Sequence, residues 1–328
     1  MYTSCVGSFP VEFCRESVER IAKDLYSIGL TYPSYPQLRD FVSMFLDPLS
    51  SKGFLCKNGL DYVFSANSVE ELEGVEIPVP FEALWFVEYV RKHGLNFAGL
   101  RAPVTGVFTL ASRIYLTGRR HSIKESLIND LTFLESLSLA ISRLIRKLED
   151  LGYSLIVVDE PILSIVYGRS ASLIKHESED VLRIFERLKP RKSTLGIHVC
   201  GRISPALFRL LLKSNFTLLD HEFKDSPENF ESLKPEEFKE SDKLLSVGCA
   251  SSRNARVENV KEVLSILSKA LNIYGDRVYM AKPDCGFRGL SGILPGDEPY
   301  KVSIMKLKTI VEAVKKLNWP NPITLRGG

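Results

Sequence analysis

The stretch Thr194-Leu195-Gly196-Ile197-His198-Val199-Cys200 decides the fold, because a short apolar run ends in two side chains that can carry chemistry. Side chains alternate along a strand, so His198 and Cys200 should lie on the same side of an extended backbone. Similar short runs, rich in β-branched or apolar residues, recur along the chain. The clearest of these other predicted strands are Leu155–Val158, Thr217–Leu219, Leu244–Val247 and Val278–Ala281.

Segments with an apolar period of about 3.6 residues separate these strands and predict helices. The predicted helices are Ser122–Asp150, Ser178–Leu188, Pro205–Lys213, Val257–Tyr274 and Val302–Leu317. Weaker strands are predicted at Ser4–Ser8, Tyr62–Phe64 and Asn96–Leu100, and extra elements at Tyr32–Phe54 and Phe287–Tyr300. Eight strands, most of them separated by helices, favour a parallel sheet that is either closed as a barrel or doubly wound.

The position of the reactive side chains favours the barrel. Polar residues or cysteines fall at the ends of the predicted strands, at Asp159, His198, Cys200, Glu222, Cys249 and Cys285. In a barrel these ends converge on one face, where active sites are built. A doubly wound sheet usually brings a glycine-rich phosphate loop near its start, and Cys5–Pro10 contains a single glycine. We therefore predict an α/β fold, a (β/α)8 TIM barrel, as a single domain over residues 1–328.

Composition excludes several classes of protein. Of the 328 residues, 45% are hydrophobic and 25% are charged, and the net charge of +3 comes without the basic, aromatic-rich runs of nucleic-acid-binding proteins. No apolar stretch approaches the roughly 20 residues of a membrane span, and the first residues lack the features of a signal peptide. We therefore expect a cytoplasmic protein that binds neither nucleic acid nor membrane. Its six cysteines should be reduced, so that any special role is in metal binding or catalysis.

A four-ligand metal site is the strongest functional indication. The His198-x-Cys200 pair alone is weak evidence for a metal site, since such a pair is more often a buried core histidine beside a buried cysteine. However, Cys285 in Pro283-Asp284-Cys285-Gly286 and Glu222 in the run 218–222 also follow apolar strands. One histidine, two cysteines and one glutamate on one face would complete a zinc site.

The fourth ligand stays open at this level. Glu222 is alternatively an exposed loop acid. His221 is a second candidate, although it should point away from Glu222 if the strand continues to that position.

Such a site suits thiol chemistry. A free thiol has a pKa near about 8.5, while the thiolate is the nucleophile. Binding to zinc removes the proton without a strong base. Two cysteinate ligands keep the centre electron-rich, and a carboxylate in the fourth position can leave as the substrate thiolate arrives, which keeps the net charge constant.

Asp159 is a candidate for substrate binding. In Asp159-Glu160-Pro161 it follows the apolar run 155–158, at the mouth of the predicted strand. A carboxylate there can hold an amino group or a guanidinium. The alternative is that Asp159 caps the next helix or pairs with an arginine of the barrel.

Taken together, these motifs resemble a known family. In order they are Gly7-Ser8-Phe9-Pro10, Pro103-Val104-Thr105, Asp159-Glu160-Pro161, His198-x-Cys200, Glu222 and Pro283-Asp284-Cys285-Gly286. The series resembles the catalytic half of cobalamin-independent methionine synthase over nearly the whole chain, and includes the 22-residue step from Cys200 to Glu222. The long form of that family has a second, N-terminal barrel. We expect this chain to act without it, like the short archaeal core methionine synthases that it resembles.

The resemblance implies a reaction and a role for each motif. The reaction is zinc-dependent transfer of a methyl group to the thiol of homocysteine, which forms methionine. The implied zinc ligands are His198, Cys200, Glu222 and Cys285. Asp159, the residue that we assign to catalysis, would hold the substrate's amino group. Backbone groups of Val6, Gly7 and Ser8 would contact its carboxylate.

Three departures from the family pattern stand out, one at the substrate's amine and two on the methyl-donor side. The family's amine-binding glutamate is replaced by the stretch 65–67, its proton-shuttling histidine by 249–254, and its folate-stacking tryptophan is missing from 106–110. Transfer from a methylfolate needs a placed general acid, whereas transfer from a methyl–cobalt bond does not. The missing tryptophan and histidine, together with the expected absence of the N-terminal barrel, therefore predict a methylated corrinoid, carried by a partner protein, as the methyl donor. The alternative is that His221 or Arg253 supplies the proton and that a folate or pterin is the methyl donor.

Other readings remain. The chain resembles, more distantly, zinc thiol methyltransferases that act on another thiol or use a corrinoid donor, such as coenzyme M methyltransferases. A lyase similar to uroporphyrinogen decarboxylase would share the barrel without zinc. A non-catalytic protein would use zinc only to stabilise its fold.

Overall fold

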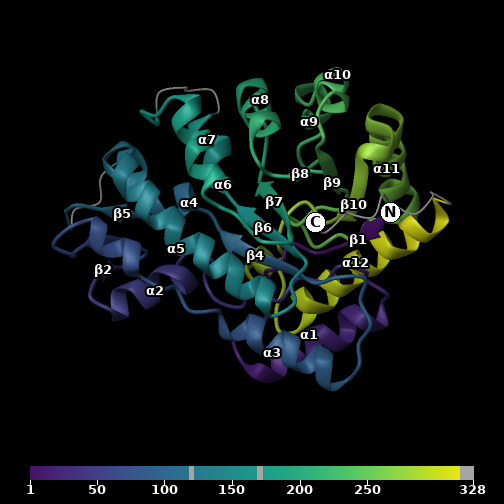
Figure 1. Ribbon diagram of the computed structural model, residues 1–328. Helices are drawn as coiled ribbons and strands as arrows, with labels where there is room; N and C mark the ends of the chain where they lie inside the picture. Colours follow the sequence, from purple (N-terminus) through teal and green to yellow (C-terminus); the bar gives the residue numbers. More distant parts are fainter. Residues whose placement is uncertain (118–121, 168–172, 318–328) are drawn as a thin grey trace.

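The computed structural model describes residues 1–117, 122–167 and 173–317 of the chain. Within them, the main sheet is parallel throughout, with seven strands in the order β1-β10-β9-β8-β7-β6-β4. The strands are β1 (Tyr2–Thr3), β4 (Arg101–Thr105), β6 (Leu155–Asp159), β7 (Thr194–Val199), β8 (Leu218–Glu222), β9 (Leu244–Gly248) and β10 (Val278–Lys282). The sheet is curled, and helices lie outside it (Figure 1). An α/β fold is confirmed, whereas the eightfold strand count of the predicted barrel is not reached.

Helices alternate with the strands along most of the chain. They are α1 (Arg15–Ser27), α2 (Ser43–Ser51), α3 (Phe81–Lys92), α4 (Val107–Ala111), α5 (Leu131–Asp150), α6 (Pro161–Val166), α7 (Ser178–Glu186), α8 (Pro205–Lys213), α9 (Asn229–Ser232), α10 (Pro235–Lys239), α11 (Val260–Tyr274) and α12 (Glu298–Lys316). Short 3₁₀ turns lie at η1 (Glu70–Gly74), η2 (Ile123–Glu125), η3 (Leu127–Asn129), η4 (Gly275–Arg277) and η5 (Arg288–Gly292). In the described part of the chain, none of these helices combines the length and the apolar character that a membrane crossing requires.

Helix α5 shows why the sequence folds in this way. Its buried residues Leu137, Ile141 and Leu144 recur every three or four positions, so that one face packs against the sheet. The side chain of Asp130 begins the helix by accepting a hydrogen bond from the backbone N–H of Phe133 at 2.9 Å. The helix predicted over Ser122–Asp150 is therefore shorter, because η2 and η3 precede this cap.

The gap between the edge strands β1 and β4 is bridged by residues 32–37. Isolated parallel bridges pair Ser4 with Tyr32, Ser8 with Gln37, and Ser34 with Arg101. This part of the predicted extra element Tyr32–Phe54 thus lies in the sheet. The remainder of that segment contains α2.

Three weak strand predictions need correction. The predicted strand Tyr62–Phe64 belongs to a separate sheet of β2 (Leu55–Asn58), β3 (Asp61–Phe64) and β5 (Ile114–Tyr115). The residues 96–100 are not a strand, and β4 begins after them. Its proline at position 103 weakens the strand pattern, because proline cannot donate to the ladder. The strand predicted at Ser4–Ser8 is wrong in position, since β1 covers Tyr2–Thr3, Ser4 and Ser8 form only isolated bridges, and Gly7 has a φ of +140°.

Candidate metal centre

A cavity of about 480 Å³ opens at the carboxyl ends of the central strands. Three predicted metal ligands and three predicted substrate-binding residues line it: His198, Cys200, Cys285, Val6, Ser8 and Asp159. The carboxyl ends of parallel strands meet at one edge, so residues far apart in the sequence converge there. Gly7 lies between two of the lining residues, and a Cβ atom on it would come within 3.0 Å of Ser34 Oγ and 3.1 Å of Pro103 Cγ.

The cluster of His198, Cys200 and Cys285 has the geometry of a metal site. The Nε2 atom of His198 lies 3.0 Å from Cys200 Sγ, and the two sulfur atoms are 3.2 Å apart. All three potential ligand atoms lie within 4.8 Å of one another. One imidazole and two thiols are a donor set that zinc prefers. The three residues therefore fit a metal ion.

Asp220 orients the histidine of this cluster. Its Oδ1 atom lies 2.8 Å from His198 Nδ1, which leaves Nε2 to face the cysteines. Its Oδ2 atom accepts a hydrogen bond from Arg101 at 2.7 Å, and Lys282 Nζ is 2.7 Å from Oδ1. All three partners of this carboxylate are buried. A metal-binding histidine typically has a carboxylate on its other nitrogen, so the arrangement also fits a metal.

The electrostatics of the cluster favour one ionised thiol: the pKa of Cys285 is lowered, whereas the hydrogen bond with Cys285 and burial raise the pKa of Cys200 well above that of a free thiol. Burial opposes ionisation of Asp220, but Lys282, Arg101 and His198 outweigh it and hold the pKa of Asp220 well below its ordinary value. Hydrogen bonds from Cys200 and then His198 lower the pKa of Cys285 well below that of a free thiol. The thiolate is the form that binds metals, so Cys285 is prepared for this role.

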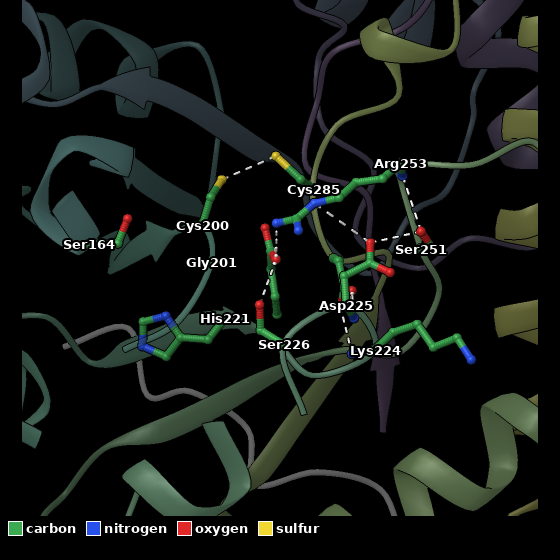
Figure 2. Close-up of polar contacts among 12 residues, drawn as sticks. Ser164, Cys200, Gly201, His221, Lys224, Asp225, Ser226, Ser251, Arg253 and Cys285 are labelled. Carbon is green, nitrogen blue, oxygen red and sulfur yellow. Dashed lines mark hydrogen bonds and ion pairs between the residues drawn. The ribbon is translucent and has the colours of Figure 1, made fainter. Parts of the chain in front are cut away.

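Glu222 stands apart from the cluster and is bound to Arg253. Its side chain is 1% exposed, and its Oε2 atom lies 2.7 Å from a guanidinium nitrogen of Arg253 and 3.2 Å from Ser226 Oγ. The alternative of an exposed loop acid is therefore wrong. In Figure 2 the Arg253 side chain extends from the loop after β9 toward Cys285. The structure thus brings three of the four predicted ligands together and gives the fourth another partner.

His221 and Cys249 do not join the cluster. Because β8 continues to Glu222, His221 points away from the cysteines, as Figure 2 shows. Its Nδ1 atom is 3.4 Å from the carbonyl oxygen of Val199. Burial lowers the pKa of His221 to about 3, so the ring is neutral. Cys249 is buried and donates to the carbonyl oxygen of Lys282 at 3.3 Å.

Asp159 and Gln37 offer polar atoms to the cavity. The Oδ1 atom of Asp159 and the Nε2 atom of Gln37 are buried and lack hydrogen-bond partners within the described ranges. Both residues line the cavity. Burial raises the pKa of Asp159 to about 7. The predicted alternative of a pair with a barrel arginine is not seen, since Arg101 binds Asp220 instead.

Sequence reasoning missed several residues around the site. The stretch 65–67, expected at the amine-binding position, does not line the cavity, whereas Gln37 does. Asp220 was visible in the sequence, since it shares a strand face with Glu222. Lys282 gave no such signal, because nothing local indicates that a strand lysine will face a buried carboxylate.

Comparison with known proteins identifies the family. Residues 102–316 match the family described as cobalamin-independent synthase, catalytic domain. The methionine synthase of Methanocaldococcus jannaschii is 26% identical over 96% of this chain and 99% of its own length. The methionine synthase of Methanothermobacter thermautotrophicus is 32% identical over 51% of this chain and 49% of its own length.

Solved structures agree on the fold. A putative vitamin-B12-independent methionine synthase from Listeria monocytogenes superposes with a TM-score of 0.68 at 15% identity, over 97% of this chain and 98% of its own. A B12-independent methionine synthase from Shewanella sp. W3-18-1, solved with selenomethionine, gives a TM-score of 0.64 at 17% identity, over 96% of this chain and 97% of its own. The resemblance seen in the motifs is thus confirmed. The chain belongs to the cobalamin-independent methionine synthase family, over the catalytic domain that defines it, and is a methyltransferase.

Proposed function

We propose that this methyltransferase transfers a methyl group to the thiol of homocysteine and forms methionine, with zinc held by His198, Cys200, Cys285 and Glu222. The observation that carries the proposal is the cluster of one imidazole and two sulfur ligands within 4.8 Å, in a cavity that Asp159 also lines. The curated relatives named methionine synthase support the choice of reaction. Zinc in this cluster would favour the thiolate form of a bound thiol at neutral pH.

The protein's own groups fix the orientation of His198. Asp220 fixes the ring of His198 so that Nε2 faces the sulfur atoms. Arg101 and Lys282 hold the Asp220 carboxylate in turn. Since all these groups are buried, the imidazole has little freedom to rotate, and the cluster is preorganised for a metal.

The rest of the cavity suits an amino acid that carries a thiol. The unpartnered Asp159 carboxylate oxygen would accept hydrogen bonds from the substrate's ammonium group. Gln37 offers an amide N–H nearby, and its backbone N–H donates to the Gly7 carbonyl oxygen at 2.9 Å. The adjacent backbone of Val6, Gly7 and Ser8 is the predicted site of the substrate's carboxylate. A thiol without these groups would leave buried polar atoms unpaired, which costs binding free energy.

For the donor, we propose a methylated corrinoid. Departure of a methylfolate nitrogen needs a general acid, and both candidates in this chain are poor ones. His221 is buried, neutral and directed away from the cluster. Partial burial lowers the pKa of Arg253, but Glu222 and Asp225 outweigh it and raise that pKa above its ordinary value, so the guanidinium retains its proton.

The experiment that tests the reaction measures zinc content and methyl transfer on one preparation of the purified protein. We expect about one zinc per chain and methionine formed from homocysteine. A protein that binds zinc but methylates only another thiol, such as coenzyme M, would contradict the proposed acceptor. A protein without zinc would contradict the proposed centre.

The donor is tested in the same assay with free methylcobalamin and with methylfolate. Turnover with methylcobalamin and none with methylfolate is expected. The reverse result would exclude the corrinoid and would require a proton donor other than His221 and Arg253.

A further inference from the structure

The proposed reaction does not explain which group would bind the Glu222 carboxylate once a substrate thiolate has replaced it on the metal. A displaced carboxylate needs either solvent or another partner. The Glu222 side chain is only 1% exposed, so solvent does not serve. A buried carboxylate without a cation or hydrogen-bond donors is strongly destabilised. The site therefore needs a second cationic partner for the Glu222 carboxylate.

Arg253 is that partner in the structure. It lies on the loop after β9 and forms an ion pair of 2.7 Å with Glu222 Oε2. Ser226 Oγ adds a hydrogen bond to the same oxygen at 3.2 Å. Lys282, a buried cation near the cluster, is already occupied by Asp220 and by the carbonyl oxygen of Asp284.

The loop holds Arg253 ready for this contact. Its backbone N–H donates to Ser251 Oγ at 3.1 Å, and Ser251 in turn donates to Asp225 at 2.7 Å. The guanidinium Nε lies 3.9 Å from the same Asp225 oxygen, and the contacts are drawn in Figure 2. The side chain is 58% exposed. It is thus anchored at its base, while much of its length is exposed.

We propose that Arg253 is the alternative partner of Glu222 and that the carboxylate alternates between the metal and Arg253. Arg253 is a positioning residue in this scheme, because it acts on the substrate only through Glu222. When the thiolate arrives, Glu222 moves to the guanidinium, so one negative ligand replaces another and no buried charge is left unpaired. This inference rests on the proposed zinc centre, and it assigns a role to a residue of the stretch 249–254, in which the resemblance would place a shuttle histidine.

The test uses the full chain and five variants. Arg253→Met removes the cation at similar length, and Arg253→Lys retains it. Arg256→Met is the matched control, since Arg256 is 59% exposed on the same loop and pairs with Glu262 instead. Glu222→Gln with and without Arg253→Met closes a double-mutant cycle. The readouts are zinc affinity by chelator competition without substrate, and the visible absorption of the cobalt-substituted protein as homocysteine is added.

Arg253→Met should bind zinc about tenfold more tightly without substrate, because Glu222 loses its competing partner. The same variant should bind homocysteine about tenfold more weakly, and the cobalt spectrum should change at correspondingly higher homocysteine concentration. Arg253→Lys should restore most of both values, and Arg256→Met should change neither. In the Glu222→Gln background, the Arg253 substitution should have no further effect.

Equal zinc affinity in the wild-type protein and in Arg253→Met would overturn the inference, as would weaker zinc binding by this variant. The zinc measurement uses no substrate, so it remains decisive even if homocysteine proves to be the wrong acceptor. Methylation of homocysteine with unchanged zinc affinity would retain the proposed function and exclude the role of Arg253. A wild-type protein that binds no zinc would overturn both.

Discussion

The Nδ1 atom of His198 lies 2.8 Å from the Oδ1 atom of Asp220, on neighbouring strands of the buried sheet. This contact connects the candidate metal centre to the ion-pair network of the core, because Asp220 also holds Arg101 and Lys282. The orientation of one candidate metal ligand and the neutralisation of two buried cations thus depend on a single carboxylate.

Asp220→Asn should therefore weaken both metal binding and folding. Loss of a carboxylate behind a metal-bound histidine typically reduces metal affinity about 10- to 100-fold. Removing one charge from a buried ion pair costs about 3–5 kcal/mol of stability. Zinc competition and urea denaturation measure the two effects. Asp242→Asn, at an exposed position before β9, is the control. Unchanged zinc affinity in Asp220→Asn would show that the histidine needs no such support.

Cys200→Ala and Cys285→Ala should each lose zinc and activity while the fold is retained, because each removes a sulfur from the three-residue cluster. Cys249→Ala is the matched control. Cys249 also ends a strand and is buried, but it donates to a backbone carbonyl and lies outside the cluster. Metal content by elemental analysis, together with circular dichroism, separates loss of the site from loss of the fold. Full zinc occupancy in either cluster variant would refute the ligand assignment.

The cluster could be predicted because the sequence signals for it lie within or directly after single strands. Alternation along a strand placed His198 and Cys200 on one side, and strand ends in a parallel sheet converge, which brought in Cys285. The pairing of Glu222 with Arg253 could not be predicted in this way. It joins the end of β8 to the loop after β9, whose relative position depends on the whole sheet, and nothing in either segment identifies the partner.

The closing segment of the sheet escaped prediction for a related reason. Residues 32–37 contain two prolines and pair through isolated bridges, so they lack the apolar run that identifies a strand. Gln37, at the end of this segment, was therefore missed as a cavity residue. The strand β4 was displaced in the prediction because its proline at position 103 interrupts the pattern.

Asp159→Asn should raise the KM for homocysteine about ten- to hundredfold while zinc is retained, since a charge-assisted hydrogen bond to the ammonium group is lost. The internal control is 4-mercaptobutyrate, a thiol without the amine, for which the substitution should make little difference. Steady-state kinetics with both thiols and a zinc assay test the expectation. Equal effects on the two thiols would mean that Asp159 acts on the cavity in general and not on the amine.

Glu149 should make the stability of the segment before strand β7 sensitive to acid. Its buried carboxylate, in the last turn of α5, accepts hydrogen bonds from the backbone N–H groups of Arg191 at 2.9 Å, Lys192 at 2.6 Å and Ser193 at 2.5 Å, just before the strand that carries His198. Burial raises the pKa of Glu149, but these backbone bonds outweigh it and lower the pKa from 4.5 to about 2. The carboxylate is thus the form that stabilises the fold.

Because the folded-state pKa of Glu149 is depressed, its stabilisation is complete above about pH 4.5 and is lost as the pH falls toward 2. Glu149→Gln should cost about 1.5–3 kcal/mol of unfolding free energy at pH 7, since one amide oxygen replaces two charged acceptors. The difference from the wild-type protein should shrink as the pH is lowered through this range. Urea denaturation between pH 7 and pH 3 measures it, with Asp150→Asn as the control, because that side chain is 62% exposed and should matter by less than about 0.5 kcal/mol. A difference that stays constant down to pH 3 would show that the backbone N–H groups do not depend on the ionised form of Glu149.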